Sequence, residues 1–321
     1  MIPRTTTRFT QESDFRQLRD FGQKFSATFE FIGAHWRGLG QAMLYLVLPT
    51  AILQGILTAL LQNQILTQAL HVAGTGASKL QQLTMLNGMY QSPIYWINVA
   101  ISGIFIMFLV LTVYGYVRCC LRPVPSPAPI AVGEVWEVVK REFIGSYLSY
   151  FGLLIVIIVG FFLLGFPGIY LSVAFSLFYI TKVVEGTGFM GTCRRCLQLV
   201  RGKWWSTFGL IMVMSFALGI VLAVVGSVVG GVSYFAAKQV GFLQTTDPSS
   251  SLGLFTVITS ALTGLINLLI YPPILLAIAF QYFNLVERRD GVGLRNMVNQ
   301  LGQAPAAVHN TDYRPDDEGE Y

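Results

Sequence analysis

The segment YLSYFGLLIVIIVGFFLL, residues 147–164, contains no charged side chain and decides the fold class. Its centre, Leu153 to Val159, has no polar residue, which excludes the alternation of apolar and polar positions typical of a membrane β-barrel. About 20 apolar residues cross the ~30 Å hydrocarbon core of a bilayer, where backbone amides must be hydrogen-bonded within the segment. The segment therefore predicts a transmembrane helix.

Five other segments follow the same pattern. The sequence predicts six membrane-spanning helices, at residues 40–61, 94–117, 147–164, 168–184, 204–237 and 252–286. Composition points the same way, because 54% of the residues are hydrophobic and only 12% are charged, against roughly 25% in soluble domains. That much apolar surface would leave large exposed patches on a water-soluble globule of this length. We therefore expect an all-α membrane protein with six transmembrane helices.

Lys and Arg residues are distributed unevenly among the connections between these predicted helices. Of the 21 Lys and Arg residues, only Lys79 and Lys238 lie in the first, third and fifth connections. Connections rich in Lys and Arg stay in the cytoplasm. We expect a multi-pass protein of the inner (plasma) membrane with both termini in the cytoplasm. Anionic lipid headgroups, and not nucleic acid, are then the partners that face these basic residues.

The predicted spans divide the chain into three regions. Residues 1–39 form a cytoplasmic N-terminus with an amphipathic helix, and residues 40–286 form the six-span membrane domain. Residues 287–321 form a cytoplasmic tail, which is acidic, poor in apolar residues and expected to be disordered after about residue 301.

Few features interrupt the apolar spans. Gly165-Phe-Pro-Gly168 predicts a tight hairpin between the third and fourth spans, with its proline ending one helix. Ionisable residues at the middle of a span mark proton relays and ion sites, but Lys182 and Glu185 lie only at a cytoplasmic end. Energy-coupled transport is therefore disfavoured. Asn98 and Asn267 are the main polar residues within spans, and we interpret them as hydrogen-bonding between helices.

Three similar amphipathic units precede the first, third and fifth predicted spans. Each has an aromatic residue at an equivalent position, namely Trp36, Phe143 and Trp204, with further apolar residues four and seven positions earlier. This spacing places apolar groups on one face of a helix, and Lys and Arg crowd the polar face. Such helices lie in the plane of the lipid headgroups, so we expect about three cytoplasmic interfacial helices. The alternative is that these units are the cytoplasmic ends of tilted spans.

The basic and aromatic residues of these units form the candidate lipid-binding site. We define the headgroup collar as Arg37, Lys140, Arg141, Arg201, Lys203, Trp36, Trp136, Trp204 and Trp205. A Lys or Arg near an anionic leaflet contributes about 1 kcal/mol to lipid binding, and Trp anchors a helix end at headgroup level. The collar is therefore expected to hold anionic lipid in preference to neutral lipid. The competing interpretation is that these charges only direct membrane insertion.

Small residues recur at every fourth position of the fifth predicted span. They are Ser215, Gly219, Ala223, Ser227 and Gly231, which we call the small-residue stripe. Small residues at this spacing allow another helix to approach closely. We favour the sixth span of the same chain as the packing partner; the alternative is another subunit.

Short motifs in the second half of the chain resemble a known family. They are Glu185-Gly186, Arg194-Arg195, Arg201-Gly-Lys-Trp-Trp205, Tyr271-Pro-Pro273 and the closing run Phe280 to Arg288. Together they are similar to the polytopic membrane domain that is fused to some bacterial glycerophosphodiester phosphodiesterases and also occurs in stand-alone proteins. The resemblance covers about residues 29–293. That family's catalytic part is a separate TIM barrel of about 250 residues with no counterpart here, so the resemblance implies a membrane fold without phosphodiesterase activity.

No motif in the sequence predicts catalysis or cofactor binding. Cys119, Cys120, Cys193 and Cys196 lie on the same predicted side and could hold zinc as four thiolates. We interpret them instead as structural, because the last two fall beside an apolar helix face and adjacent cysteines suit tetrahedral ligation poorly. Gly186–Gly191 matches the GxGxxG pattern of dinucleotide-binding proteins, yet it follows a membrane span instead of a strand. We therefore expect no metal, no cofactor and no enzyme activity.

These observations favour a non-catalytic membrane protein. We expect an accessory or scaffold that binds anionic lipids, partner proteins or both at its cytoplasmic face. One alternative is a facilitator or channel for lipid or small solutes, which a continuous polar path through the bundle would favour. The other is an enzyme, which would need facing acidic or Cys/His ligands at the membrane edge.

Overall fold

The computed structural model describes residues 9, 12–74, 88, 90–121, 130–163, 165–239, 248–292, 295 and 298. Within these ranges every regular element is a helix, which confirms the expected all-α class. The tail predicted to be disordered after residue 301 lies outside the described residues.

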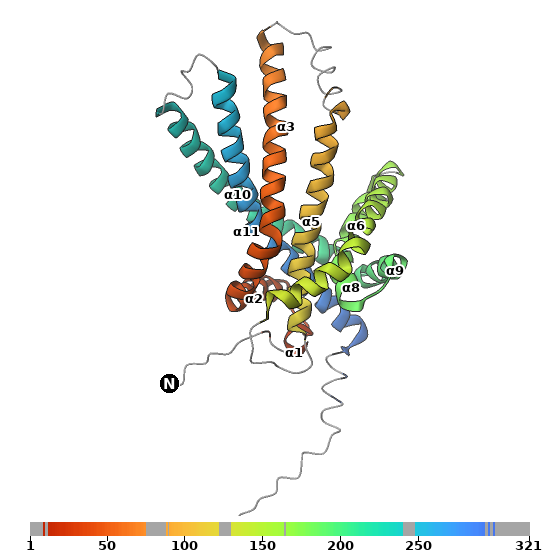
Figure 1. Ribbon diagram of the computed structural model, residues 1–321. Helices are drawn as coiled ribbons and strands as arrows, with labels where there is room; N and C mark the ends of the chain where they lie inside the picture. The colour runs from red at the N-terminus through yellow and green to blue at the C-terminus, as the bar shows by residue number, and fades with distance from the viewer. Residues whose placement is uncertain are drawn as a thin grey trace, which may run out of the picture.

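The helices gather at one end of the molecule and diverge towards the other. In chain order they are α1 (Glu12–Phe15), α2 (Phe21–Ala42), the π-helix η1 (Met43–Val47), α3 (Leu48–Gly74), α5 (Pro93–Cys120), α6 (Val132–Phe162), α7 (Phe166–Phe175), α8 (Phe178–Glu185), α9 (Phe189–Val200), α10 (Trp204–Gln239) and α11 (Pro248–Asp290). Figure 1 shows α3, α5, α10 and α11 rising from a common base, where α1, α2, α8 and α9 lie. We call this end the base.

Six helical segments of the described chain are long and apolar enough to cross a membrane. They are Phe21–Ile65, Pro93–Cys120, Val132–Phe162, Phe166–Glu185, Trp204–Val232 and Gly264–Asp290. This number confirms the expectation of six such helices. Their outer surfaces carry large apolar side chains, such as Leu269 at 74% exposure, which suit a lipid environment.

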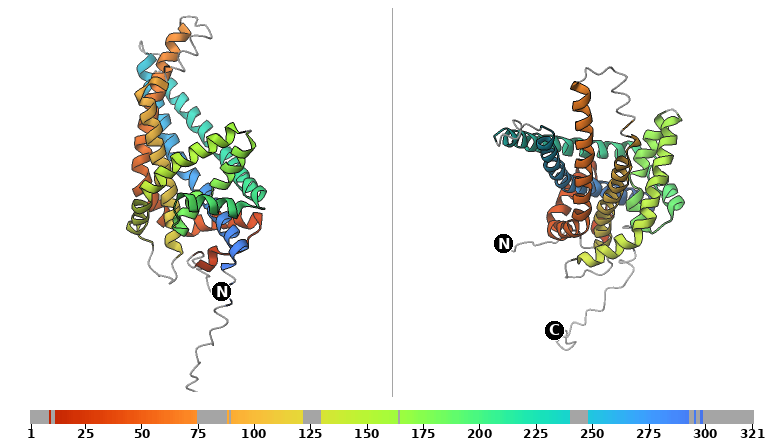
Figure 2. Two further views of the ribbon diagram at one scale, coloured as in Figure 1. Left: turned by 90° about the vertical axis from the view of Figure 1, so that its right-hand side faces the viewer. Right: turned by 45° about the horizontal axis from the view of Figure 1, so that its top comes forward.

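The first two amphipathic units run without a break into the spans that follow them. α2 continues through η1 into α3, and the second unit and the third predicted span together form α6. The boundaries predicted at residues 40 and 147 are therefore not helix ends. Figure 1 and the left view of Figure 2 show α2 turned across the base below α3. The third unit, α9, is separated from α10 by a turn in which Gly202 has a φ of +80°, a conformation that favours glycine.

The hairpin between α6 and α7 differs from its prediction in one respect. Gly165, with a φ of +79°, makes the turn, and Pro167 stands in the first turn of α7 instead of ending a helix. Proline is tolerated there because the first N–H groups of a helix have no acceptor within it. Gly168 permits close packing, since a Cβ at this position would lie 2.6 Å from a ring carbon of Phe161.

The fourth predicted span is divided into two short helices. α7 and α8 are separated by a turn at Ser176 and Leu177, where the Ser176 hydroxyl donates to the carbonyl of Val173 at 2.8 Å. Hydroxyl bonds of this kind bend helices. At ~1.5 Å per residue, neither the 10 residues of α7 nor the 8 of α8 cross a ~30 Å core alone. Figure 1 and the left view of Figure 2 show the α6–α7 hairpin ending well below the upper ends of α3 and α5.

The best-packed part of the core lies in the base. Phe15 of α1 stacks on Phe280 of α11 with ring centroids 6.0 Å apart, and it also contacts Phe283 at 5.4 Å. Phe31 of α2 closes the cluster edge-to-face against Phe280 at 6.1 Å. All four side chains are buried. This aromatic cluster joins the start of the chain to the lower half of α11 and supports the residues of the candidate site.

Candidate functional site

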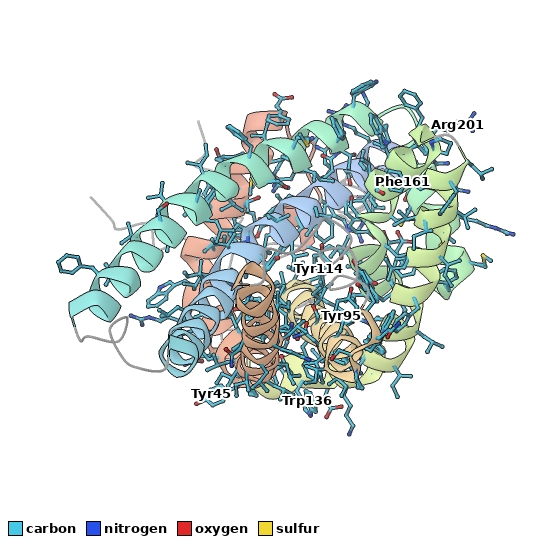
Figure 3. All side chains as sticks on the ribbon, turned by 90° about the horizontal axis from the view of Figure 1, so that it is seen from above. Tyr45, Tyr95, Tyr114, Trp136, Phe161 and Arg201 are labelled. Carbon is cyan, nitrogen blue, oxygen red and sulfur yellow. The ribbon has the colours of Figure 1, made fainter. Side chains whose placement is uncertain are left out.

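The headgroup collar is exposed in the structure. All its members are exposed except Trp204, which is partly buried, and Trp205 leaves 77% of its surface uncovered. Seen from above in Figure 3, Trp136 and Arg201 stand at opposite edges of the molecule, with Tyr114 between them. The collar residues are therefore spread around the molecule and do not form one patch.

Most cations of the collar have no acidic partner among the residues that the structure describes. Arg141 pairs with Glu142 at 3.2 Å. No described residue forms an ion pair with the remaining four, which are Arg37, Lys140, Arg201 and Lys203. The guanidinium of Arg37 instead lies 5.4 Å from the ring centroid of its neighbour Trp36. These side chains are free to bind anions supplied from outside the chain.

Aromatic contacts hold the collar at the start of α10. Trp204 stacks on Phe208 with ring centroids 5.1 Å apart, and its indole N–H donates to the carbonyl of Tyr170 at 3.3 Å. Trp205 packs edge-to-face on Trp204 at 4.8 Å. An apolar ring body with a polar N–H is the chemistry that suits the boundary between headgroups and hydrocarbon.

Three of the motif residues meet in an ionic cluster between α8, α9 and α11. Arg195 Nε donates to Glu185 Oε1 at 3.0 Å, and Arg195 Nη2 also bonds to Asp290. The Tyr282 hydroxyl donates to the same Glu185 oxygen at 2.9 Å. Burial alone would lower the pKa of Arg195, but its hydrogen bonds to Asp290 and Glu185 outweigh that effect and raise the pKa above its usual value. We call this group the Arg195 clamp, because it joins three helices.

A second set of polar contacts ties α11 to other elements of the base. Gln281 Nε2 donates to Thr207 Oγ1 at 2.9 Å, and Asn284 Nδ2 donates to the carbonyl of Arg19 at 2.8 Å. The Arg19 guanidinium is itself buried and donates to the carbonyl of Phe15 at 2.8 Å. Burial lowers the pKa of Arg19. The polar residues of the closing motif run thus serve as tethers between helices.

Lys182 of α8 is a buried cation near Glu142 of α6. It is 7% exposed, and its Nζ donates to Ser146 Oγ of α6 at 3.0 Å. Among the residues that the structure describes, no carboxylate forms an ion pair with it. A lysine at the end of a span ordinarily extends its ammonium group to water. Here the side chain lines a cavity of about 380 Å³ between α6, α8 and the start of α9.

None of the four cysteines forms a disulfide bond. Cys119 and Cys120 are buried at the end of α5, and Cys193 and Cys196 lie on α9. Burial raises the pKa of Cys193, and it raises the pKa of Cys196 to about 12. A raised pKa keeps a thiol protonated at neutral pH, whereas zinc binds thiolate. In the described part of the chain, no group of three His, Cys, Asp or Glu side chains is placed to hold a metal.

The small-residue stripe of α10 faces outward. All five of its residues are exposed, and a Cβ added at Gly219 or Gly231 would meet no atom of the described residues within 4 Å. The packing expected against the sixth span is therefore not seen. α10 contacts α11 through a different face, on which Leu210 and Met214 are buried with Ala277.

Sequence reasoning anticipated the contact of Asn98 but not the position of Lys182. Asn98 Nδ2 donates to Thr58 Oγ1 at 3.1 Å and so links α5 to α3, as expected. The side chain of Asn267 lies outside the described residues. One sequence pattern could have indicated the cavity beside Lys182, because Gly145 and Gly152 are small residues on one face of α6.

Comparisons with known proteins leave the family open. No family model matches the chain, and neither a curated protein nor a solved structure matches it. The resemblance to the membrane domain of glycerophosphodiester phosphodiesterases therefore stays a hypothesis that rests on short motifs. Function has to be argued from the geometry of the base.

Proposed function

We propose that this chain is a non-catalytic protein of the inner membrane that binds anionic lipids through the headgroup collar. In this proposal it serves as an accessory or scaffold in the membrane, and the base, with both termini, faces the cytoplasm. The collar then lies at the depth of the lipid headgroups, and the exposed apolar surfaces of the longer helices contact acyl chains.

The unpaired cations of the collar are the observation that carries this proposal. Arg37, Lys140, Arg201 and Lys203 are exposed and have no ion-pair partner among the described residues. The Arg195 clamp differs, because its charged members pair with one another. The collar therefore keeps cations available for external anions, beside indole rings that suit the headgroup region.

The distribution of the collar favours lipid over a macromolecular anion. Its residues belong to α2, α6, the turn before α10 and the start of α10, and Trp136 and Arg201 stand at opposite edges of the molecule in Figure 3. A nucleic acid or an acidic protein would contact one side of the molecule at a time. A lipid annulus surrounds a membrane protein and can occupy all these positions together.

The test neutralises four collar cations and keeps a matched control. Lys140, Arg141, Arg201 and Lys203 are replaced by Gln, while the control exchanges Lys for Arg and Arg for Lys at the same positions. Each charge contributes about 1 kcal/mol, and one lipid meets either Lys140 with Arg141 or Arg201 with Lys203. The Gln variant should therefore lose about 2 kcal/mol per lipid, which is roughly 30-fold in its preference for phosphatidylglycerol and cardiolipin. Native mass spectrometry of the purified proteins measures the bound lipid.

Two results decide the outcome of this test. Both variants must first show the topology of the parent, because the same charges direct insertion. The charge-preserving control should then retain as much anionic lipid as the parent, and the Gln variant should retain clearly less. Equal retention in the Gln variant and the parent would contradict the proposal and leave the collar as an insertion signal only.

A further inference from the structure

A cavity opens between α6, α8 and the start of α9. Its volume is about 380 Å³, and its walls include Gly145, Leu148 and Gly152 of α6, Lys182 of α8 and Phe189 of α9. The two glycines allow the neighbouring side chains to approach α6 closely: a Cβ at Gly145 would lie 3.0 Å from Lys182 Nζ, and one at Gly152 would lie 3.0 Å from the ring of Phe189. Lys182 and Phe189 therefore rest directly on the backbone of α6. No member of the headgroup collar lines this cavity.

Among the described residues no carboxylate lies within ion-pair distance of Lys182, and Glu142 attracts its charge only from farther away. The ammonium group of Lys182 donates to the neutral hydroxyl of Ser146 at 3.0 Å, and the residue is only 7% exposed. Glu142, one turn earlier on α6, forms its ion pair with Arg141 instead. A buried cation without an ion-pair partner is strongly unfavourable, and ionisable groups inside membrane segments commonly mark binding sites.

The start of α9 adds a second positive feature to the same cavity. Gly188, the residue before the first turn of α9, lines the cavity with Phe189, and no side chain caps this helix end. The first N–H groups of a helix have no acceptor within it, and the helix dipole is positive there. The N-terminus of a helix is accordingly a common site for phosphate or carboxylate groups.

We propose that this cavity binds one anionic phospholipid, with its headgroup phosphate between Lys182 and the N-terminus of α9. The inference rests on the proposed function in placing the chain among anionic lipids, but it assigns a separate site. The cavity walls are mostly apolar, and Leu148 at its edge is 71% exposed towards the lipid-facing side of α6. An acyl chain can follow this side of α6, where Ile155 is also exposed, whereas a free phosphate would leave the apolar walls uncovered.

Removal of the charge on Lys182 gives the sharpest test. The parent and Lys182→Met are compared in nanodiscs of phosphatidylcholine, alone and mixed with phosphatidylglycerol. In phosphatidylcholine alone the variant should unfold at a higher temperature, because it no longer buries an unpaired charge. Phosphatidylglycerol should raise the Tm of the parent by more than it raises the Tm of the variant, because the variant keeps only the collar. Native mass spectrometry should show one tightly held phosphatidylglycerol per parent chain and about ten-fold less in the variant.

Controls separate this site from the collar and from soluble anions. Lys140→Met removes an exposed collar cation and should keep the single bound lipid, as should the four-site Gln variant of the collar. Leu148→Trp narrows the cavity from its exposed edge and should weaken binding even if Lys182→Met fails to fold. Inorganic phosphate added to phosphatidylcholine nanodiscs should leave the parent Tm unchanged.

Three outcomes would overturn the inference. An equal gain in Tm from phosphatidylglycerol in the parent and Lys182→Met would show that the lysine does not hold the lipid. Unchanged lipid retention in Leu148→Trp would show that the cavity is not occupied. A gain from inorganic phosphate equal to that from phosphatidylglycerol would assign the site to a soluble anion. None of these results depends on the fate of the annular lipid at the collar.

Discussion

Some charged residues of the base are exposed and others are held in ion pairs, and composition cannot distinguish the two. Arg194 and Arg195 are adjacent in the chain, yet Arg194 is exposed and Arg195 lies between Glu185 and Asp290. The acid that completes this pairing comes from α11, far along the chain. Charge counting could therefore predict a basic membrane edge, but the choice of which cations are paired depends on contacts between distant elements.

Loss of the Arg195 clamp should destabilise the fold. Arg195→Met leaves Glu185 and Asp290 without their shared partner and should lower the free energy of unfolding by about 1–3 kcal/mol. The side chains of Arg195, Glu185 and Asp290 keep 22%, 23% and 29% of their surface exposed. Because solvent screens these charges, the loss of stability should be smaller than for a fully buried ion pair. Arg194→Met, as the control, should change stability by less than about 0.5 kcal/mol. The Tm values of the two variants are measured by thermal unfolding in the same detergent. Equal Tm values would show that the Arg195 clamp does not stabilise the fold.

At the scale of helices, hydrophobicity predicted the existence of the spans better than their ends or their contacts. The length of the apolar segments identified six spans. The amphipathic units that precede the spans predicted to begin at residues 40 and 147, however, are continuous with those spans. The small-residue stripe shows the physical limit. A repeat of small residues says that one helix face permits close approach, whereas the position of the neighbouring helix is decided by packing elsewhere, here at Leu210 and Met214.

Two glycines provide a matched test of helix packing. Gly168→Ala should destabilise the protein by about 1–3 kcal/mol, because a Cβ would lie 2.6 Å from the Phe161 ring and 2.7 Å from its backbone nitrogen. Gly219→Ala, on the outward stripe, should be neutral or stabilising by up to about 1 kcal/mol, since alanine favours helix more than glycine does. Both are measured as shifts in Tm in the same detergent. Destabilisation at Gly219 alone would show that the stripe is a buried contact.

For the molecule as a whole, class and number of spans followed from composition, whereas the architecture of the base did not. The closing run from Phe280 to Arg288 was recognised as a motif, and the structure shows its Gln281, Tyr282 and Asn284 tethering α11 to three other parts of the base. The cavity at Lys182 escaped prediction for a related reason. A lysine at the end of a span ordinarily extends to water, and only the approach of α6 through Gly145 and Ser146 encloses it.

The orientation of the base is the claim on which both lipid sites depend, and cysteine accessibility tests it most directly. Gln91→Cys lies just before α5, which begins at its upper end in Figure 1, and Glu137→Cys lies on α6; both positions are exposed. Each is introduced into a chain whose own four cysteines are replaced by Ala, and intact cells are treated with a membrane-impermeant maleimide before and after permeabilisation. The account predicts labelling of position 91 from outside and of position 137 only after permeabilisation. Labelling of position 137 in intact cells, with position 91 protected, would contradict it.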